Sequence, residues 1–432
     1  MIFYAWGEGE LVALMILSGI FNYSIGIAIE KWNAKKLLIV IGVVINLLAL
    51  IYYKYIGLLL GSFDHLFGTH LNNGINIHLP IGISFYTFHS MSYIIDIYRQ
   101  KISAQKNPLR FLLYLSLFPQ LVAGPIVRYI EIEKEIASRN HTLERFVEGA
   151  KRFCVGLAKK VLLANVLGEI ADELFMLPSN EMYYATSWFG LMAYTMQIYY
   201  DFSGYSDMGI GLGQMFGFTF PENFNFPYIA KSVKEFWRRW HITLSSWFRD
   251  YLYIPLGGSR VSKGRIYLNL AIVFFLTGLW HGATWNFVLW GMFHGLFLII
   301  ERAGLDKIME KTKVLGHLYT LLIVMLAWVL FRIPELDTAL HFYSSLIHAK
   351  MNGVGLYLSD YLDLEYIVIF GLGILLSFPV KNVIIKLKQQ ISRPVLLNAW
   401  DYASTIFHLL LLFLSAMSIA SSTYNPFIYF RF

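Results

Sequence analysis

Long apolar runs, separated by short clusters of lysine and arginine, constrain this chain more than any other feature. The runs 11–29, 315–330 and 399–420 are close to the ~20 residues that a helix needs to cross the hydrocarbon core of a bilayer. Hydrophobic residues make up 57% of the 432 positions and charged residues only 15%, whereas a soluble domain has about 25% charged residues. The sequence therefore predicts an all-α polytopic membrane protein.

Basic residues set the expected orientation, because cytoplasmic loops of membrane proteins are enriched in lysine and arginine. Lys31, Lys35 and Lys36 follow the first run, so we expect this end in the cytoplasm and the N-terminus outside. Alternation of sides along the chain then gives an extracytoplasmic C-terminus. The net charge of +7 is spread over these loops, and we do not expect nucleic-acid binding. We predict a multi-pass protein of the cell membrane with a single membrane-embedded domain, residues 1–432.

Cysteine and histidine usage argues against a metal site. Cys154 is the only cysteine, which excludes an intrachain disulfide and a cysteine-based zinc site. The loop 62–78 contains three histidines and no lysine or arginine. Their irregular spacing among asparagine and glycine favours a solvated loop over a metal site, so we predict no bound metal.

The segment 111–127 is apolar but has basic residues on both flanks. It contains Pro119, Gly124 and Pro125, residues that interrupt helices. A re-entrant segment would explain both facts, since irregular backbone survives at membrane depth only inside protein or beside a water-filled cavity. A proline-kinked ordinary span is the alternative interpretation.

The segment 185–218 is too long for one simple span and contains the sequence DFSGYSD. Asp201 and Asp207 either line a polar interior or cap helix ends at a break made by Gly204. The sequence does not decide between these two interpretations.

Residues 231–251 form a basic stretch rich in tryptophan, KSVKEFWRRWHITLSSWFRDY. Placed at 100° per residue, its basic side chains share one face of a helix and its aromatic side chains share the opposite face. We expect one amphipathic helix at the cytoplasmic interface. His241 falls on the border between the two faces.

Residues 266–300 are mostly apolar with basic residues on both sides, which predicts a helical hairpin. Its middle, GLWHGATW, contains Gly278 and Gly282, which permit a break or a close helix contact. This interpretation places His281 at or beyond the bilayer midplane. We therefore expect His241 and His281 at two depths of one route through the protein rather than in one compact pair.

A histidine at membrane depth is costly and points to a function. A dry imidazole is expected to be neutral and able to act as a general base on a hydroxyl. The basic residues of 231–249 suit a phosphorylated cytoplasmic donor. Together these features predict group transfer across the membrane. A packed, hydrogen-bonded helix contact is the alternative role for such a histidine, and the sequence holds no P-loop, nucleophilic serine or cysteine motif, or zinc-ligand set.

Several longer motifs extend through the chain. They include LFPQLVAGPIVR, DFSGYSDMGIGLGQMFGF, WRRWH, GLWHGATWNFVLWG and the terminal NPFIYFRF. In these motifs the chain resembles the membrane-bound O-acyltransferase (MBOAT) family, in particular its bacterial alginate and polysaccharide O-acetyltransferase branch. The resemblance implies that His281, in GLWHG, is the catalytic histidine and that His241, in WRRWH, is the second active-site residue. It also implies a ring of transmembrane helices around a central pore, with re-entrant segments.

The same resemblance implies an activity and a partner. An acetyl group would pass from cytoplasmic acetyl-CoA, a donor rather than a tightly bound cofactor, across the membrane toward an extracytoplasmic polysaccharide. An extracytoplasmic acetyltransferase of the SGNH type would complete the transfer. The segment from Tyr424 to Phe432 is aromatic and predicted to face outward, which suits docking of this partner.

Two alternatives stay open at this point. One is D-alanyl transfer for teichoic-acid modification, although the loop PLGGSR is more similar to the acetylation branch. The other is a non-enzymatic polysaccharide or lipid transporter in which both histidines are packing residues.

Overall fold

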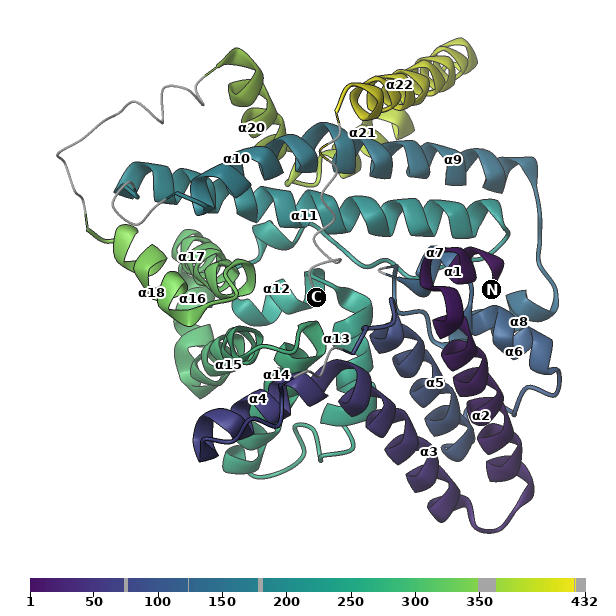
Figure 1. The fold of residues 1–432 in the computed structure, drawn as a ribbon. Coiled ribbons are helices and arrows are strands. Elements are labelled where there is room, and N and C mark those ends of the chain that lie inside the picture. The colour runs from purple at the N-terminus through teal and green to yellow at the C-terminus, as the bar shows by residue number, and fades with distance from the viewer. Residues whose placement is uncertain (74–76, 123, 178–181, 349–362, 423, 425–432) are drawn as a thin grey trace.

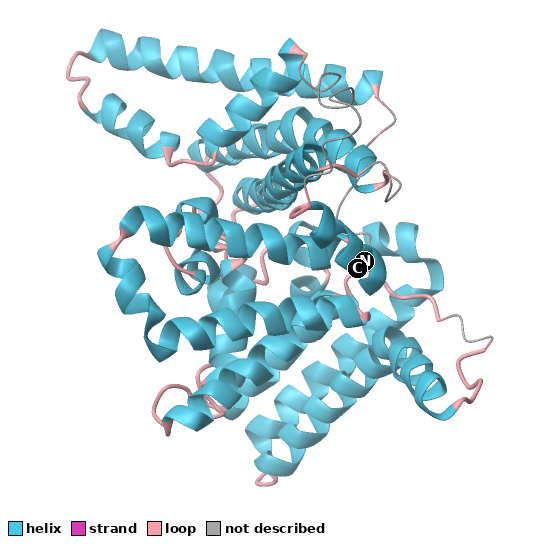
Figure 2. Cartoon of the chain, turned by 90° about the vertical axis from the view of Figure 1, so that its left-hand side faces the viewer, coloured by secondary structure: helices cyan, strands magenta, loops and turns pink. Residues whose placement is uncertain are grey.

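The computed structural model describes residues 1–432 except 74–76, 123, 178–181, 349–362, 423 and 425–432 (Figure 1). Within this described part every regular element is a helix and no strand occurs (Figure 2). A helix pairs its own backbone N–H and C=O groups, and lipid offers no hydrogen-bonding partner for such groups. The prediction of an all-α, multi-pass membrane protein is confirmed, because several helical segments are long and apolar enough to cross a membrane. In the described part of the chain these segments are Tyr4–Lys31, Lys35–Phe67, Trp285–Met309, Lys313–Arg332 and Pro394–Ser421.

The N-terminal helices form one bundle, seen at the lower right of Figure 1. In this bundle α5 packs against both α2 and α3. The amides of Asn22 and Asn46 bridge α2 and α3 with hydrogen bonds of 3.2 and 2.7 Å, so neither buried amide is left unpaired. In chain order the N-terminal elements are α1 (Ile2–Glu8), η1 (Gly9–Leu11), α2 (Val12–Lys31), α3 (Lys35–Leu50), the π-helical η2 (Ile51–Tyr55), α4 (Ile56–Phe67) and α5 (Ile83–Tyr98). Of these, α4 extends away from the bundle, to the lower left of Figure 1.

The proline-containing segment 111–127 is not a continuous helix. Its helical parts are the end of α6 (Pro108–Leu115) and the four residues of α7 (Phe118–Leu121), after which an irregular stretch leads to α8 (Tyr129–Ala137). The alternative of a kinked ordinary span is therefore wrong. Its re-entry into the membrane stays a prediction.

Two long helical rods lie side by side in the upper part of Figure 1. One is α9 (Leu143–Ala158), which continues through η3 (Lys159–Ala164) into α10 (Asn165–Phe175), and the other is α11 (Tyr184–Met215). The interpretation that includes a helix break at Gly204 is wrong, because α11 is uninterrupted. A Cβ on Gly204 would lie 2.7 Å from the carbonyl oxygen of Gly156. The missing side chain thus lets the two rods approach closely.

The two aspartates of DFSGYSD pair with basic residues of the neighbouring rod instead of capping helix ends. Asp201 lies 2.7 Å from Lys160, and Asp207 lies 2.8 Å from Arg152 and 2.7 Å from Lys159. Burial alone disfavours a charged carboxylate, and pairing compensates this cost. The capping interpretation is therefore wrong, and these groups join α11 to the rod formed by α9 and η3.

The C-terminal half contains the predicted hairpin and the helices that follow it. The hairpin is confirmed as α14 (Lys263–His281) and α15 (Trp285–Ile300). A Cβ on Gly278 would meet the carbonyl oxygen of Phe287 at 2.3 Å, which shows how closely the two arms pack. The remaining elements are η6 (Glu301–Leu305), α16 (Asp306–Lys311), α17 (Lys313–Arg332), α18 (Leu336–Ser345), α20 (Leu364–Leu376), α21 (Val380–Gln389) and α22 (Pro394–Ser421).

Candidate active site

The stretch around His241 is broken where a single amphipathic helix was predicted. Helix α12 (Val233–Arg239) and helix α13 (Ile242–Phe248) are separated at His241, whose backbone has φ 44° and ψ 54°. This left-handed conformation is uncommon for a residue other than glycine and often marks a functional position. A preceding loop holds the break, since Ile242 N donates to Asn223 O at 2.9 Å.

The two faces of this stretch separate as predicted, but the aromatic face is buried inside the protein. Trp237, Trp240 and Trp247 are all buried, whereas Lys234 and Arg238 are exposed. The prediction of one continuous helix is therefore wrong, and its position at the cytoplasmic interface stays a prediction.

Asn223 fixes the tautomer of His241. Nδ1 of His241 lies 3.1 Å from Oδ1 of Asn223, and the same Oδ1 accepts hydrogen bonds from the backbone N of Thr243 at 3.2 Å and from its hydroxyl at 2.9 Å. Because Oδ1 can only accept, Nδ1 must carry the proton that it donates. In the neutral ring, Nε2 is then the nitrogen without a proton, and no group in the described part of the chain hydrogen-bonds to it.

The irregular stretch after α7 is hydrogen-bonded to the residues that hold His241. The backbone N of Ile126 donates to the Thr243 hydroxyl at 3.0 Å, and that hydroxyl donates onward to Asn223. The proline-containing segment thus contributes to the position of His241 through two intervening residues.

His281 is the last residue of α14 and lies beside His241. The two ring centroids are 6.3 Å apart, so the expectation of two separate depths is wrong. His281 is 4% exposed, and the rings of Trp290 and Phe331 lie 4.8 and 5.3 Å from it. Neither of its ring nitrogens has a hydrogen-bond partner among the described residues. A buried polar group without a partner is costly, and both ring nitrogens of His281 are available to a reacting group.

Lys54 and Tyr55, from the π-helical segment η2, hold the turn of α14 that carries His281. Lys54 Nζ donates to the carbonyl oxygen of Trp280 at 2.5 Å and to the hydroxyl of Ser84 at 3.2 Å. The Tyr55 hydroxyl donates to the carbonyl oxygen of Leu279 at 2.9 Å. The last carbonyls of a helix lack partners within it, and a cation there is favoured by the helix dipole. These contacts fix the direction in which α14 ends.

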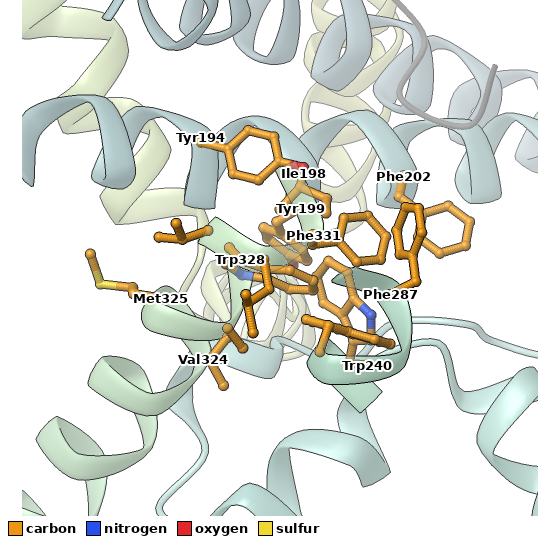
Figure 3. Packing of buried hydrophobic residues seen from close by; sticks show 14 of the residues in the cluster. Tyr194, Ile198, Tyr199, Phe202, Trp240, Phe287, Val324, Met325, Trp328 and Phe331 are labelled. Carbon is orange, nitrogen blue, oxygen red and sulfur yellow. The ribbon is translucent and has the colours of Figure 1, made fainter. Parts of the chain in front are cut away.

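Aromatic side chains enclose the histidine pair, and Figure 3 shows several of them gathered against α11. A cavity of about 10 Å³ remains beside His281, which is at the lower limit for holding one water molecule. The site is therefore dry, and a substrate must displace side chains to enter. The cavity is lined by Ile198, Phe202, Trp240, His281, Trp290, Trp328 and Phe331.

Two further polar residues of this region were not identified from the sequence. His294, on α15, is fully buried, and its ring centroid lies 5.1 Å from that of Trp290. Lys54 lies inside the apolar run 37–60. Both residues could have been identified from the sequence, because each is a lone titratable residue inside an apolar run. Such a residue is energetically costly in a membrane.

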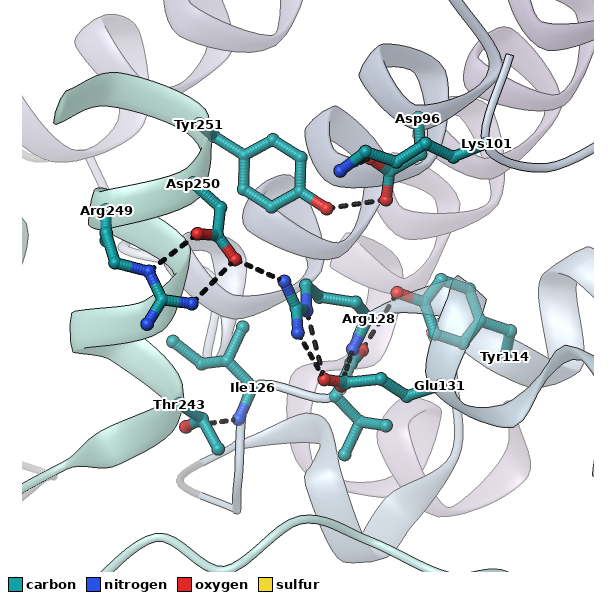
Figure 4. A network of polar contacts seen from close by, with 11 residues as sticks. Asp96, Lys101, Tyr114, Ile126, Arg128, Glu131, Thr243, Arg249, Asp250 and Tyr251 are labelled. Atoms are coloured by element: carbon teal, nitrogen blue, oxygen red, sulfur yellow. Dashed lines mark hydrogen bonds and ion pairs between the residues drawn. The ribbon is translucent and has the colours of Figure 1, made fainter. Parts of the chain in front are cut away.

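A charged network lies at the end of α13, where the chain continues into η5 (Arg249–Tyr253). Figure 4 shows Asp250 between two guanidinium groups, those of Arg249 at 2.7 Å and Arg128 at 2.8 Å. Burial alone would raise the pKa of the Asp250 carboxyl, but its hydrogen bonds and the charges of both arginines lower that pKa below its ordinary value. Arg128 also pairs with Glu131 at 2.6 Å, so its guanidinium bonds to two carboxylates.

Among the described residues, no three histidine, cysteine, aspartate or glutamate side chains come together as a set of metal ligands. The arrangement around His241 and His281 instead suits proton transfer. One imidazole has a defined tautomer with an unprotonated nitrogen, and its neighbour has both nitrogens unpartnered, within a dry enclosure.

Comparisons with known proteins agree with this chemistry. The family model described as MBOAT, membrane-bound O-acyltransferase family, matches residues 1–336. A probable alginate O-acetylase, AlgI, of Pseudomonas aeruginosa is 38% identical over 100% of this chain and 93% of the relative. A peptidoglycan O-acetyltransferase of Helicobacter pylori is 33% identical over 100% of this chain and 90% of the relative. A teichoic acid D-alanyltransferase of Streptococcus thermophilus is 29% identical over 58% of this chain and 68% of the relative.

Proposed function

Because this chain belongs to the membrane-bound O-acyltransferase family, we propose that it transfers an acetyl group for the O-acetylation of an extracytoplasmic polysaccharide, with cytoplasmic acetyl-CoA as the donor. Two of the relatives that match the full chain are named for O-acetylation of a polysaccharide, alginate in one case and peptidoglycan in the other. Family membership favours an O-acyltransferase over the transporter alternative. The D-alanyltransferase relative matches a smaller share of the chain at lower identity, which favours acetyl over D-alanyl as the transferred group.

The observation that carries the proposal is the meeting of His281 and His241 in one dry enclosure. In the proposed reaction, the oxygen of an acceptor hydroxyl bonds to the carbonyl carbon of the acetyl thioester. The carbon–sulfur bond breaks, and the thiolate of coenzyme A leaves. The hydroxyl proton passes to an unpartnered ring nitrogen of His281 and from there to the thiolate. His241 supports this transfer from the donor side.

The same proposal includes the arrangement in the membrane. The helices surround a central pore that contains both histidines, the segment 111–127 re-enters the membrane, and both termini are extracytoplasmic. Support comes from the basic residues between the apolar runs and from the irregular backbone of 111–127 beside Thr243.

Replacement of His281 tests the reaction directly. His281→Ala removes the general base, so acetyl incorporation into polymer should fall by about 10²–10⁴-fold while the protein still inserts and accumulates in the membrane. The measurement is ester content of the polymer, with protein amount from the same membranes. Normal acetylation in this variant would refute the catalytic assignment. Incorporation of D-alanine in place of acetate by the unchanged protein would refute the choice of acyl group.

An SGNH-type acetyltransferase is proposed as the extracytoplasmic partner, docked by the segment from Tyr424 to Phe432. Most of this segment lies outside the described residues. Tyr424 itself is partly buried, and its hydroxyl donates to Asp172 at 2.7 Å. Deletion of residues 425–432 keeps this contact and should lower the acetylation of the polymer at unchanged protein level. An unaltered ester content after the deletion would contradict partner docking by this segment.

A further inference from the structure

The cavity of about 10 Å³ borders the His281 ring, which acts as the base in the proposed reaction. Apart from His281, the described residues that line it are all aliphatic or aromatic. Figure 3 shows Ile198, from α11, gathered with Trp240, Trp328 and Phe331. The cavity is therefore an apolar space at the place of the reaction.

The acetyl group must come close to the same ring. A base takes its proton from a hydroxyl at hydrogen-bond distance, about 3 Å, and the oxygen of that hydroxyl bonds to the carbonyl carbon of the acetyl group. The methyl group is attached to this carbon, so it lies within a few bond lengths of His281. An apolar space suits the methyl group, whereas a carbonyl oxygen placed there would lose its hydrogen bonds.

The size of the cavity matches a methyl group and little more. A space of about 10 Å³ is at the lower limit for one water molecule, and a methyl group is close to a water molecule in size. A propionyl or butyryl group would place further carbons in the same space. Extra methylenes in a close-packed interior force side chains out of their preferred rotamers, so the cavity favours acetyl over longer acyl groups.

The aromatic part of the cavity wall is held in place by contacts between rings. The ring centroid of Trp328 lies 6.1 Å from that of Trp290 and 5.4 Å from that of Phe331. The ring centroids of Trp240 and Trp328 are 5.0 Å apart. Closely packed rings move only when their neighbours move with them, so this part of the wall resists a longer acyl chain.

Ile198 is the one aliphatic residue among the described residues that line the cavity. It belongs to α11, whereas Trp328 and Phe331 belong to α17. Its side chain is buried, with 3% of the residue exposed. Isoleucine can be shortened to valine or to alanine without adding a polar atom, so this position can change the depth of the cavity in small steps.

The lining also discriminates by charge. A D-alanyl group carries an ammonium group on the carbon next to its carbonyl, which is the place of the methyl carbon in an acetyl group. No carboxylate belongs to the described residues that line the cavity, and a buried charge without a partner is costly. The cavity therefore disfavours a D-alanyl group more strongly than an uncharged group of the same shape.

We propose that this cavity seats the methyl group of the acetyl donor, and that Ile198 limits the transferred acyl group to acetyl. This assignment rests on the proposed acetyl transfer and deepens it. The cavity belongs to the donor, so the assignment is independent of how the acetyl group later reaches the polysaccharide.

Competition between thioesters tests the assignment. In native membranes containing the full-length protein, unlabelled acetyl-, propionyl- or butyryl-CoA competes with radiolabelled acetyl-CoA for transfer to the polymer. Half-inhibition should need at least tenfold more propionyl-CoA than acetyl-CoA, and more butyryl-CoA still, because one methylene changes selectivity by about 10–200-fold. The loss of labelled acetate reports the donor site, whatever acyl groups the partner can pass on. Equal inhibition by all three thioesters would overturn the proposal.

Shortening Ile198 should relax this selectivity in steps. Relative to acetyl-CoA, propionyl-CoA should inhibit Ile198→Val severalfold more strongly than the unchanged protein, and butyryl-CoA should inhibit Ile198→Ala at least tenfold more strongly. Ile198→Val removes a single methyl group, so it provides the test even where Ile198→Ala does not accumulate.

Ile210→Ala is the matched control. Ile210 lies on the same helix, is 4% exposed and is not among the residues that line the cavity. This variant makes the same substitution in α11 and should keep the selectivity of the unchanged protein. Selectivity in both Ile198 variants equal to that of Ile210→Ala would overturn the role of Ile198.

The two levels of inference fail differently. If the unchanged protein transfers no acetyl group from acetyl-CoA to the polymer, the proposed function fails. If it transfers acetyl groups normally but is inhibited equally by the three thioesters, only the acetyl seat is refuted.

Discussion

Two polar regions of this protein lie at opposite ends of α13 and differ in how their hydrogen bonds are satisfied. At the end of α13, Arg128 and Arg249 pair with Asp250, and Arg128 pairs with Glu131 as well. At the start of the same helix, Nε2 of His241 and both nitrogens of His281 have no partner among the described residues. A satisfied network holds a structure in place, whereas an unsatisfied one is completed by a ligand. The charged network at the end of α13 is therefore a structural scaffold, and the histidine pair at its start is the candidate site of the reaction.

The largest effect in this comparison is expected at His241. His241→Ala removes the imidazole beside His281 and should lower acetyl transfer at least 100-fold, within the range for a group that assists proton transfer. The acetyl content of the polymer, normalised to protein in the membrane, measures the loss. Activity equal to that of the unchanged protein would make His241 a packing residue.

Variants of Asn223 test whether catalysis needs a defined tautomer of His241 or only the presence of its ring. Asn223→Asp keeps an oxygen acceptor for Nδ1 and should retain more activity than Asn223→Leu, which removes that acceptor. We expect at least a tenfold difference in transfer rate between the two variants at equal protein level. Equal rates would show that the contact of 3.1 Å between Nδ1 and Asn223 is not needed for catalysis.

A smaller effect is expected at Lys54, which touches the backbone before His281 and not the ring itself. Lys54→Met leaves the Trp280 carbonyl without its donor and should lower the transfer rate about tenfold, equivalent to ~1.4 kcal/mol. Lys54→Arg restores a cationic donor at the end of α14 and should recover part of the rate. Equal rates in both variants would show that the donor has no positioning role.

The smallest effect on catalysis is expected in the satisfied network. Arg128→Met removes the bonds to Asp250 and Glu131 and should destabilise the protein by about 1–3 kcal/mol, seen as a lower Tm in detergent. Its transfer rate per folded molecule should stay within twofold of the unchanged protein. A rate loss as large as that of His241→Ala would contradict the separation of scaffold from chemistry.

The sequence predicted those features that depend on local pattern. The apolar runs and the two faces of the stretch around His241 follow from the pattern of polar and apolar residues. The α14–α15 hairpin follows from the basic residues on both sides of one long apolar run. Basic flanks and prolines also indicated that 111–127 is no ordinary helix. His281 was singled out because it is polar inside an apolar run.

Tertiary contacts decided the features that the sequence did not predict. The break at His241 depends on backbone and side-chain bonds to Asn223, 18 residues earlier in the chain, and no periodicity signals it. A helix break at Gly204 was one of two open interpretations, but the role of this glycine depends on the backbone of Gly156 in the neighbouring rod. The proximity of His241 and His281 likewise requires knowing how the break before α13 lies relative to the end of α14.

The dryness of the enclosure around His281 has a consequence for the cell. An acetyl thioester is an activated group that water can hydrolyse, and a space of about 10 Å³ leaves at most one water molecule beside the base. Exclusion of water from an active site suppresses such side reactions. Membranes that lack acceptor polymer should therefore release little coenzyme A, and each acetyl group drawn from metabolism should end as an ester on the product.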